Sequence, residues 1–205
     1  PRGKYKMVAI AAATDNPSKD NKVSIKSQTK VVFPKNEATD MFYTYQDIAV
    51  KDREESQNYD CILKRGVTVL QLDSRSEIRP DYIKSFQCTV TGNCGNVFNP
   101  TTGHCLQPAT LTKTYDISGD RFKAKRFLFT IYFFLGGDDV TDITLNTQTT
   151  DTEDKVVKKL SFENVHMVKG KMTIYKGPFL STHSSASFII DSPTIPDSGF
   201  STEFE

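Results

Sequence analysis

Short apolar runs recur along the chain, separated by clusters of glycine, proline, asparagine and aspartate every 8–15 residues or so. The runs are rich in β-branched and aromatic residues, and helical periodicity is nowhere sustained. The pattern predicts an all-β protein in which only residues 34–43 and 79–82 could carry a helical turn. The expected strands are residues 5–12, 23–32, 44–50, 59–72, 83–91, 111–117, 127–135, 143–150, 156–162, 171–175 and 187–190.

The run 127–135 carries no charge, so we expect a central strand buried on both faces. A membrane helix would need about 20 apolar residues, and this run is far shorter. It leads into Gly136-Gly137-Asp138-Asp139, which looks like the metal-binding hairpin of RNA-dependent polymerases. Two-metal catalysis needs further carboxylates and a larger protein around them. An ordinary turn with solvated aspartates is therefore favoured.

Charge and motifs give no sign of catalysis. The chain has 26 Lys/Arg and 25 Asp/Glu, and without a basic stripe we expect no nucleic-acid partner. His104, His166 and His183 are not at metal-ligand spacing, and no catalytic motif is present. Asp138, Asp139 and the nearby Asp142 could hold calcium, but EF-hand spacing is absent. We expect no enzyme activity, no cofactor and no metal site.

The four cysteines are Cys61, Cys88, Cys94 and Cys105, and they match no zinc pattern. An even count in a strand-rich chain suggests export and disulfides. Cys94 and Cys105 flank a predicted hairpin at residues 97–104 and could close it, and Cys61 could pair with Cys88. The strand alternation also allows Cys61 and Cys88 to be core thiols, so both alternatives stay open.

A charged stretch at residues 51–58 interrupts the strands, as a long hairpin loop or a domain linker. We expect a partial N-terminal β-sandwich at residues 1–52 and a C-terminal β-sandwich at residues 53–205. The first domain is short and should lack a strand unless upstream chain supplies it. The chain begins without an initiator Met or a signal sequence, so any targeting segment has been removed or lies in chain not shown.

Five segments with strand and turn motifs follow one another along the chain, at residues 3–12, 40–43, 63–70, 83–103 and 162–177. In this order they resemble the fimbrillin-like and fimbrial anchor proteins of Bacteroidales. Each motif alone is a pattern common to strands and turns, so the resemblance depends on the order in which the motifs occur. His166 replaces the usual proline, and Gly66-Val67-Thr68 replaces a Val-Ala pair. The family's leading strand and lipidation site are absent, so membrane anchoring is not carried over to any residue here.

The resemblance implies two transthyretin-like, Greek-key β-sandwiches and a stalk, tip or anchor role in an exported surface fimbria. The partners would be other fimbrial subunits and a host or bacterial surface ligand, with contact to the outer membrane only through chain not shown. The resemblance also implies that stalk subunits polymerise by strand exchange, in which a sandwich that lacks a strand accepts one from its neighbour. At the C-terminus, Phe200 and Phe204 share one face and could form the domain's own last strand or a strand donated to a neighbour. The alternative function is a stand-alone carbohydrate- or protein-binding β-sandwich module at the cell surface.

Overall fold

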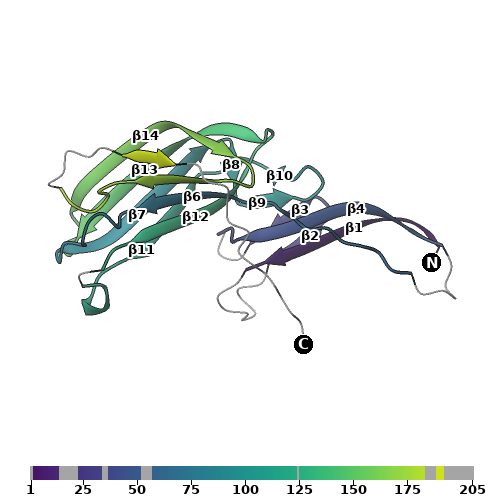
Figure 1. The fold of residues 1–205 in the computed structure, drawn as a ribbon, viewed down its shortest axis with the longest axis horizontal. Coiled ribbons are helices and arrows are strands. Elements are labelled where there is room, and N and C mark those ends of the chain that lie inside the picture. The colour runs from purple at the N-terminus through teal and green to yellow at the C-terminus, as the bar shows by residue number, and fades with distance from the viewer. Residues whose placement is uncertain are drawn as a thin grey trace.

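The computed structural model describes residues 2–13, 23–33, 37–51, 57–123, 125–182 and 188–191, and they form an all-β fold (Figure 1). Within these residues the one helical element is the 3-10 turn η3 (Asp120–Phe122), and no helix is long and apolar enough to span a membrane. The strands are β1 (Gly3–Ala12), β2 (Ser24–Ser27), β3 (Lys30–Val32), β4 (Met41–Val50), β5 (Lys64–Arg65), β6 (Thr68–Asp73), β7 (Ile83–Gly92), β8 (Cys94–Gly95), β9 (Val97–Asn99), β10 (His104–Cys105), β11 (Leu111–Asp116), β12 (Leu128–Leu135), β13 (Val140–Asp151), β14 (Val156–Val168), β15 (Met172–Lys176) and β16 (Ile189–Asp191).

The larger core lies between two sheets of a β-sandwich. One sheet has the order β11-β7-β13-β14, and the other has the order β16-β15-β6-β12-β8. Alternate residues of each strand point inward, as the pleat requires. Phe86 of β7 and Phe129 of β12 stack across the sandwich with ring centroids 4.2 Å apart. The pairing is antiparallel except between β6 and β15, which run parallel.

A smaller core lies beside the sandwich, between the sheets β10-β9-β3-β2 and β1-β4-β5. Tyr43 of β4 meets Phe98 of β9 edge to face, with ring centroids 4.6 Å apart. Strand β12 serves both cores, because Phe133 and Leu135 point into the larger core and Phe134 points into the smaller one. The two cores are therefore joined through a shared strand.

Most of the expected strands are present, and the all-β sandwich prediction is confirmed. Three expectations were wrong. The 3-10 turn at residues 120–122 lies outside the two segments that were expected to carry a helical turn, and residues 79–82 are not helical. Residues 23–32 form the hairpin β2–β3, because Gln28 and Thr29 make a solvent-exposed turn. Residues 59–63 are not a strand, and the rest of that run is split at Gly66, where a Cβ atom would lie 2.7 Å from Cε of Met41.

Strand β12 is central only in part. Residues 129–135 are all half-buried or buried, but Leu128 at the start of the strand is 42% exposed. One edge pairs with β6, whereas β8 covers the other edge only at Phe134 and Leu135. A bridge from Ala38 to Tyr132 and a hydrogen bond from the Tyr115 hydroxyl to the Thr130 carbonyl (2.7 Å) occupy more of that edge.

The expected division of the chain at residues 52 and 53 falls on the segment 52–56, outside the described residues. The boundary stays a prediction. The smaller core nevertheless draws on both sides of it, since Val67, Phe98 and Phe134 pack with Val31 and Met41. The N-terminal strands thus obtain part of their burial from the C-terminal half of the chain.

Candidate functional site

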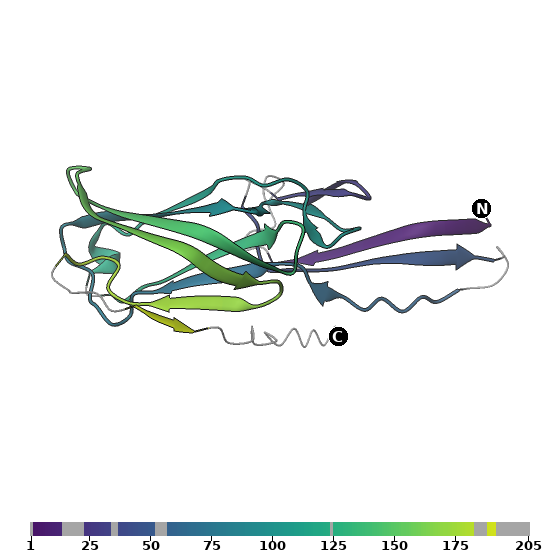
Figure 2. The same cartoon turned by 90° about the horizontal axis from the view of Figure 1, so that it is seen from above.

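Strands β1 and β4 form a long two-stranded ribbon that projects from the body of the protein (Figures 1 and 2). They pair along all 10 residues of each strand. Strand β5 joins the far side of β4 only at Phe42 and Tyr43. Beyond that point, the Tyr59 hydroxyl donates to the Ala49 carbonyl (2.7 Å) and the Gln46 amide donates to the Asp60 carbonyl (3.1 Å). Some of the backbone hydrogen-bonding groups on the edge of β4 that faces away from β1 therefore have partners.

The outer edge of β1 pairs with none of the described residues. The Ala13 amide donates to the Asp40 carbonyl (2.8 Å), so odd-numbered residues of β1 direct their backbone groups toward β4. By the alternation of an antiparallel ladder, even-numbered residues direct theirs outward. These are Lys4, Lys6, Val8, Ile10 and Ala12. Such a row of donors and acceptors is a template for another strand.

Both faces of the ribbon carry apolar side chains. Val8, Ile10 and Tyr45 lie on the face that continues into the smaller core, whereas Met7 and Ile48 lie on the opposite face. All five are only half-buried. An apolar stretch on both faces is typical of a strand inside a sandwich, and an isolated ribbon is at best marginally stable in water. The ribbon therefore has the composition of an unfinished sandwich.

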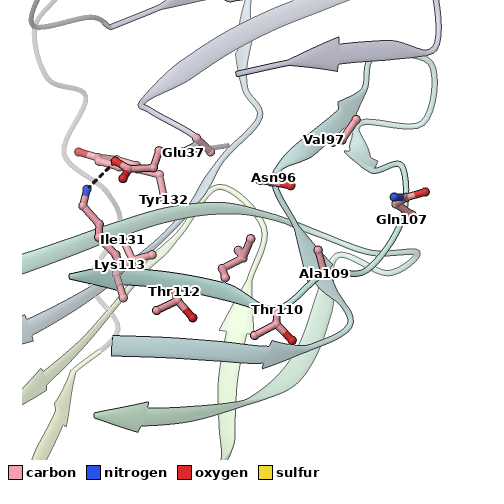
Figure 3. A pocket seen from close by; sticks show the side chains of 12 residues that line it. Glu37, Asn96, Val97, Gln107, Ala109, Thr110, Thr112, Lys113, Ile131 and Tyr132 are labelled. Carbon is pink, nitrogen blue, oxygen red and sulfur yellow. Dashed lines mark ion pairs between the residues drawn. The ribbon is translucent and has the colours of Figure 1, made fainter. Parts of the chain in front are cut away.

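A pocket of about 430 Å³ lies where the smaller core meets the sandwich (Figure 3). Figure 3 shows the ion pair between Glu37 and Lys113 at one end, where the carboxylate oxygen and Nζ are 3.6 Å apart. The lining is Glu37, Ala38, Asn96, Val97, Gln107, Ala109, Thr110, Leu111, Thr112, Lys113, Ile131 and Tyr132. These amides and hydroxyls can hydrogen-bond a polar group, but the lining contains no nucleophile next to a base.

The Gly-Asp-Asp segment after β12 is a turn. Gly137 adopts φ +79°, and Asp138 and Asp139 are exposed. Asp139 Oδ1 lies 3.2 Å from Lys169 Nζ and 3.6 Å from His104 Nε2. Burial, together with the Lys169 charge, lowers the pKa of His104 from its ordinary value. Among the described residues no group of three or more His, Cys, Asp or Glu side chains could hold a metal ion.

The other two histidines do not join this cluster. His166 lies on β14 and its Nδ1 is 3.1 Å from Asp142 Oδ1 at an exposed site. His183 lies outside the described residues. Phe200 and Phe204, the predicted strand-exchange residues, also lie outside them. Their role stays a prediction.

The cysteines occupy different parts of the fold, and none of the four is bonded to another in this structure. Cys88 and Cys94 belong to the larger core, Cys105 to the smaller core, and Cys61 is exposed in the segment beside β4. The expected hairpin at residues 97–104 is present as β9–β10, in which Cys105 pairs with Phe98. The Cys94–Cys105 and Cys61–Cys88 disulfides stay predictions.

Thiol labelling separates these alternatives. Burial raises the pKa of Cys88 and of Cys94 to about 12, and it also raises that of Cys105, so these thiols are protonated and shielded. We expect only Cys61 to react quickly in the native protein. After denaturation without reductant, all four should react if no disulfide exists, and two if Cys94 pairs with Cys105. Rapid native labelling of a second cysteine would contradict the burial described here.

The sequence predicted a first domain that lacks a strand, but it did not predict which edge would lack a partner. The apolar stretch 7–13 was the available signal, since it fits a strand covered on both faces. The pocket where the smaller core meets the sandwich could not be found from the sequence, because its lining comes from four separate stretches of chain. The buried Arg79 was missed as well, since an isolated arginine in a turn does not differ from a surface residue by pattern.

Comparison with known proteins gives a likeness of fold. No protein-family model matches the chain, and no curated protein matches it. A solved structure of a candidate adhesin from Bacteroides ovatus has a TM-score of 0.51 and 11% identity, covering 80% of this chain and 66% of that chain. A candidate adhesin from Bacteroides thetaiotaomicron has a TM-score of 0.41 and 12% identity, covering 95% of this chain and 76% of that chain. The chain thus spans just under two thirds of the first match, with which it shares its β-sandwich fold.

Proposed function

We propose that this chain is a non-enzymatic, fimbrillin-like subunit of a bacterial surface fimbria and that it assembles by β-strand complementation. The observation that supports this most directly is the outer edge of β1, which has no strand partner among the described residues. The ordered motif resemblance and the fold shared with a candidate adhesin from Bacteroides ovatus support the same proposal. On this proposal the protein is exported, and its adhesive role at the cell surface is that of a stalk, tip or anchor subunit.

In the proposed assembly, one strand is added to the sheet at the outer edge of β1. An incoming strand would pair with the outward backbone groups of the five even-numbered residues of β1. Side chains flanking it would cover Val8, Ile10 and Met7, which are half-buried in the single chain. Fully burying one aliphatic side chain contributes about 1.5–3 kcal/mol, so several such contacts would make the joint long-lived. The strand would come from another fimbrial subunit or from upstream chain.

Substitution of Val8 by proline tests whether assembly uses the outer edge of β1. The Val8 amide points outward, so proline removes a donor of the free edge and leaves the β1–β4 pairing intact. We expect the wild-type chain to form long-lived, SDS-resistant oligomers with itself or with fimbrial partners, and Val8→Pro to remain monomeric with nearly unchanged thermal stability. Size-exclusion chromatography with light scattering, and gels of unheated samples, give the measurement.

Val8→Ala is the matched control, because it shortens the same side chain but keeps the amide, and it should still assemble. Deletion of residues 198–205 identifies the donor. An intact fold that no longer assembles means that the tail is donated, whereas a destabilised monomer means that it is an internal strand. If the wild type stays monomeric under all these conditions, or if Val8→Pro assembles as the wild type does, strand complementation at β1 is wrong.

A further inference from the structure

Four strands of the larger sandwich have one terminus in a common row: β6 and β15 end there, and β12 and β16 begin there. Lys176 of β15 pairs with Asp73 of β6 and with Ile189 of β16, and Asp73 also pairs with Leu128 of β12. The opposite end of β12, at Phe134, packs into the smaller core. The row therefore lies at the end of the sandwich away from the β1–β4 ribbon, as Figure 1 shows for the connection between β11 and β12.

An open groove of about 740 Å³ lies along this row. Its lining is Asp73, Arg75, Ser76, Arg126, Lys176, Gly177, Pro178 and Ile189. Three of these residues are cationic and only one is acidic. Pro178 and the exposed Ile189 add an apolar surface, and Ser76 adds a hydroxyl. We call this the basic groove.

Two of the three cations already have carboxylate partners. Arg75 donates to Asp73 through Nε (2.9 Å), Nη2 (2.7 Å) and its backbone amide (3.0 Å), and these bonds hold the pKa of Asp73 below its ordinary value. Lys176 Nζ lies 3.2 Å from Asp191. Both carboxylates are thus occupied by cations.

Arg126 differs from these two cations. Its Nη1 donates to the Arg75 carbonyl (2.7 Å), but it contacts no carboxylate among the described residues. One hydrogen bond therefore holds an exposed guanidinium at the groove, and no ion pair within the described residues neutralises its charge. An arginine fork matches the geometry of a carboxylate or sulfate group.

The chain next to the groove is basic as well. Residues 121–126 contain four cations and no acid, and three of these cations, Arg121, Lys123 and Lys125, precede Arg126. All three are exposed, and within the described residues Lys123 and Lys125 form no ion pair. Asp116 and Asp120 lie close by in the sequence and offset part of this charge. The remaining field attracts anions to the groove.

We propose that the basic groove binds an acidic sugar residue of a polysaccharide. Arg126 would bind the carboxylate or sulfate group, and Pro178 and Ile189 would contact the apolar face of the sugar ring. Nucleic acid is bound through an extended basic stripe, whereas two of the three cations in this groove already pair with carboxylates. The inference goes beyond fimbrial assembly and does not depend on the β1 edge, because all eight described lining residues belong to the sandwich of one chain.

Binding of the full chain to immobilised polysaccharides tests the proposal. The probes are polygalacturonate for carboxylate, dextran sulfate for sulfate and unmodified dextran as the neutral control. We expect binding to one or both acidic polymers, weakened by salt, and none to dextran. Arg126→Ala should weaken binding about tenfold, which corresponds to the loss of a charge-assisted hydrogen bond. Arg126→Lys, which keeps the charge without the fork, should have an intermediate effect.

Lys155→Ala is the control for net charge, because Lys155 is an exposed lysine paired with Glu153 on the turn between β13 and β14. It should bind as the wild type does. Equal losses in Lys155→Ala and Arg126→Ala would mean that charge alone drives binding and would overturn the site. Unchanged binding by a folded Arg126→Ala variant, or no binding by the wild type, would overturn it too. If polyglutamate binds as tightly as polygalacturonate with the same dependence on Arg126, the assignment to a sugar is wrong.

Discussion

Replacement of Phe129 by alanine is expected to lower the free energy of unfolding by about 3–5 kcal/mol. Phe129 is 1% exposed and lies at the centre of the aromatic cluster of the larger core. Its ring centroid is 4.2 Å from that of Phe86, 4.9 Å from Tyr115 and 5.6 Å from Phe127. Truncation removes these contacts and leaves a cavity that strands in two paired sheets have little freedom to fill.

Urea denaturation followed by circular dichroism measures this change. Leu128→Ala is the matched control, since Leu128 is the preceding residue of the same strand, points to the opposite face and is 42% exposed. It should change the free energy of unfolding by less than about 1 kcal/mol. If both variants lost similar free energies of unfolding, any truncation in this strand would be destabilising. The aromatic cluster would then contribute no more to stability than the exposed face does.

Replacement of Arg79 by methionine is expected to lower the free energy of unfolding by about 2–4 kcal/mol. The Arg79 side chain is 4% exposed, and its guanidinium donates to backbone carbonyls in two separate connections. Nε donates to Phe122 (3.3 Å), and Nη1 donates to Ile83 (2.8 Å), Pro80 (3.1 Å) and Asp81 (3.2 Å). Methionine has a similar apolar length but no donor, so these carbonyls would lose their partners.

Arg79→Lys should lie between the wild type and Arg79→Met, because a lysine ammonium can reach some of the carbonyls but lacks the planar fork. Arg121→Met is the control, as Arg121 is an exposed arginine in the connection that Arg79 fixes. It should be close to neutral in stability. A neutral Arg79→Met variant would show that water replaces the guanidinium at these carbonyls.

The candidate sites were predictable to different degrees. The apolar stretch 7–13 fits a strand covered on both faces, but which edge of that strand lacks a partner could not be inferred from the sequence. The basic groove could not be inferred, because Arg75, Arg126 and Lys176 lie far apart in the chain and meet only through strand register. Similarly, nothing near Arg79 in the sequence indicates that four carbonyls surround its side chain.

The sequence by itself determined which segments extend. Local alternation and β-branched and aromatic residues locate β7, β11 and most of β13, because strand propensity and the two-residue pleat act within a few neighbouring residues. The tertiary structure decided which strands pair: β6 lies parallel to β15, β3 pairs with β9, and β12 divides its side chains between two cores. Strand partners are selected by complementary burial between segments distant in the chain, and the energy of that burial exists only after the sheets meet. For the same reason the outer edge of β1, which pairs with no described strand, became identifiable only when the partners of the other described strands were in place.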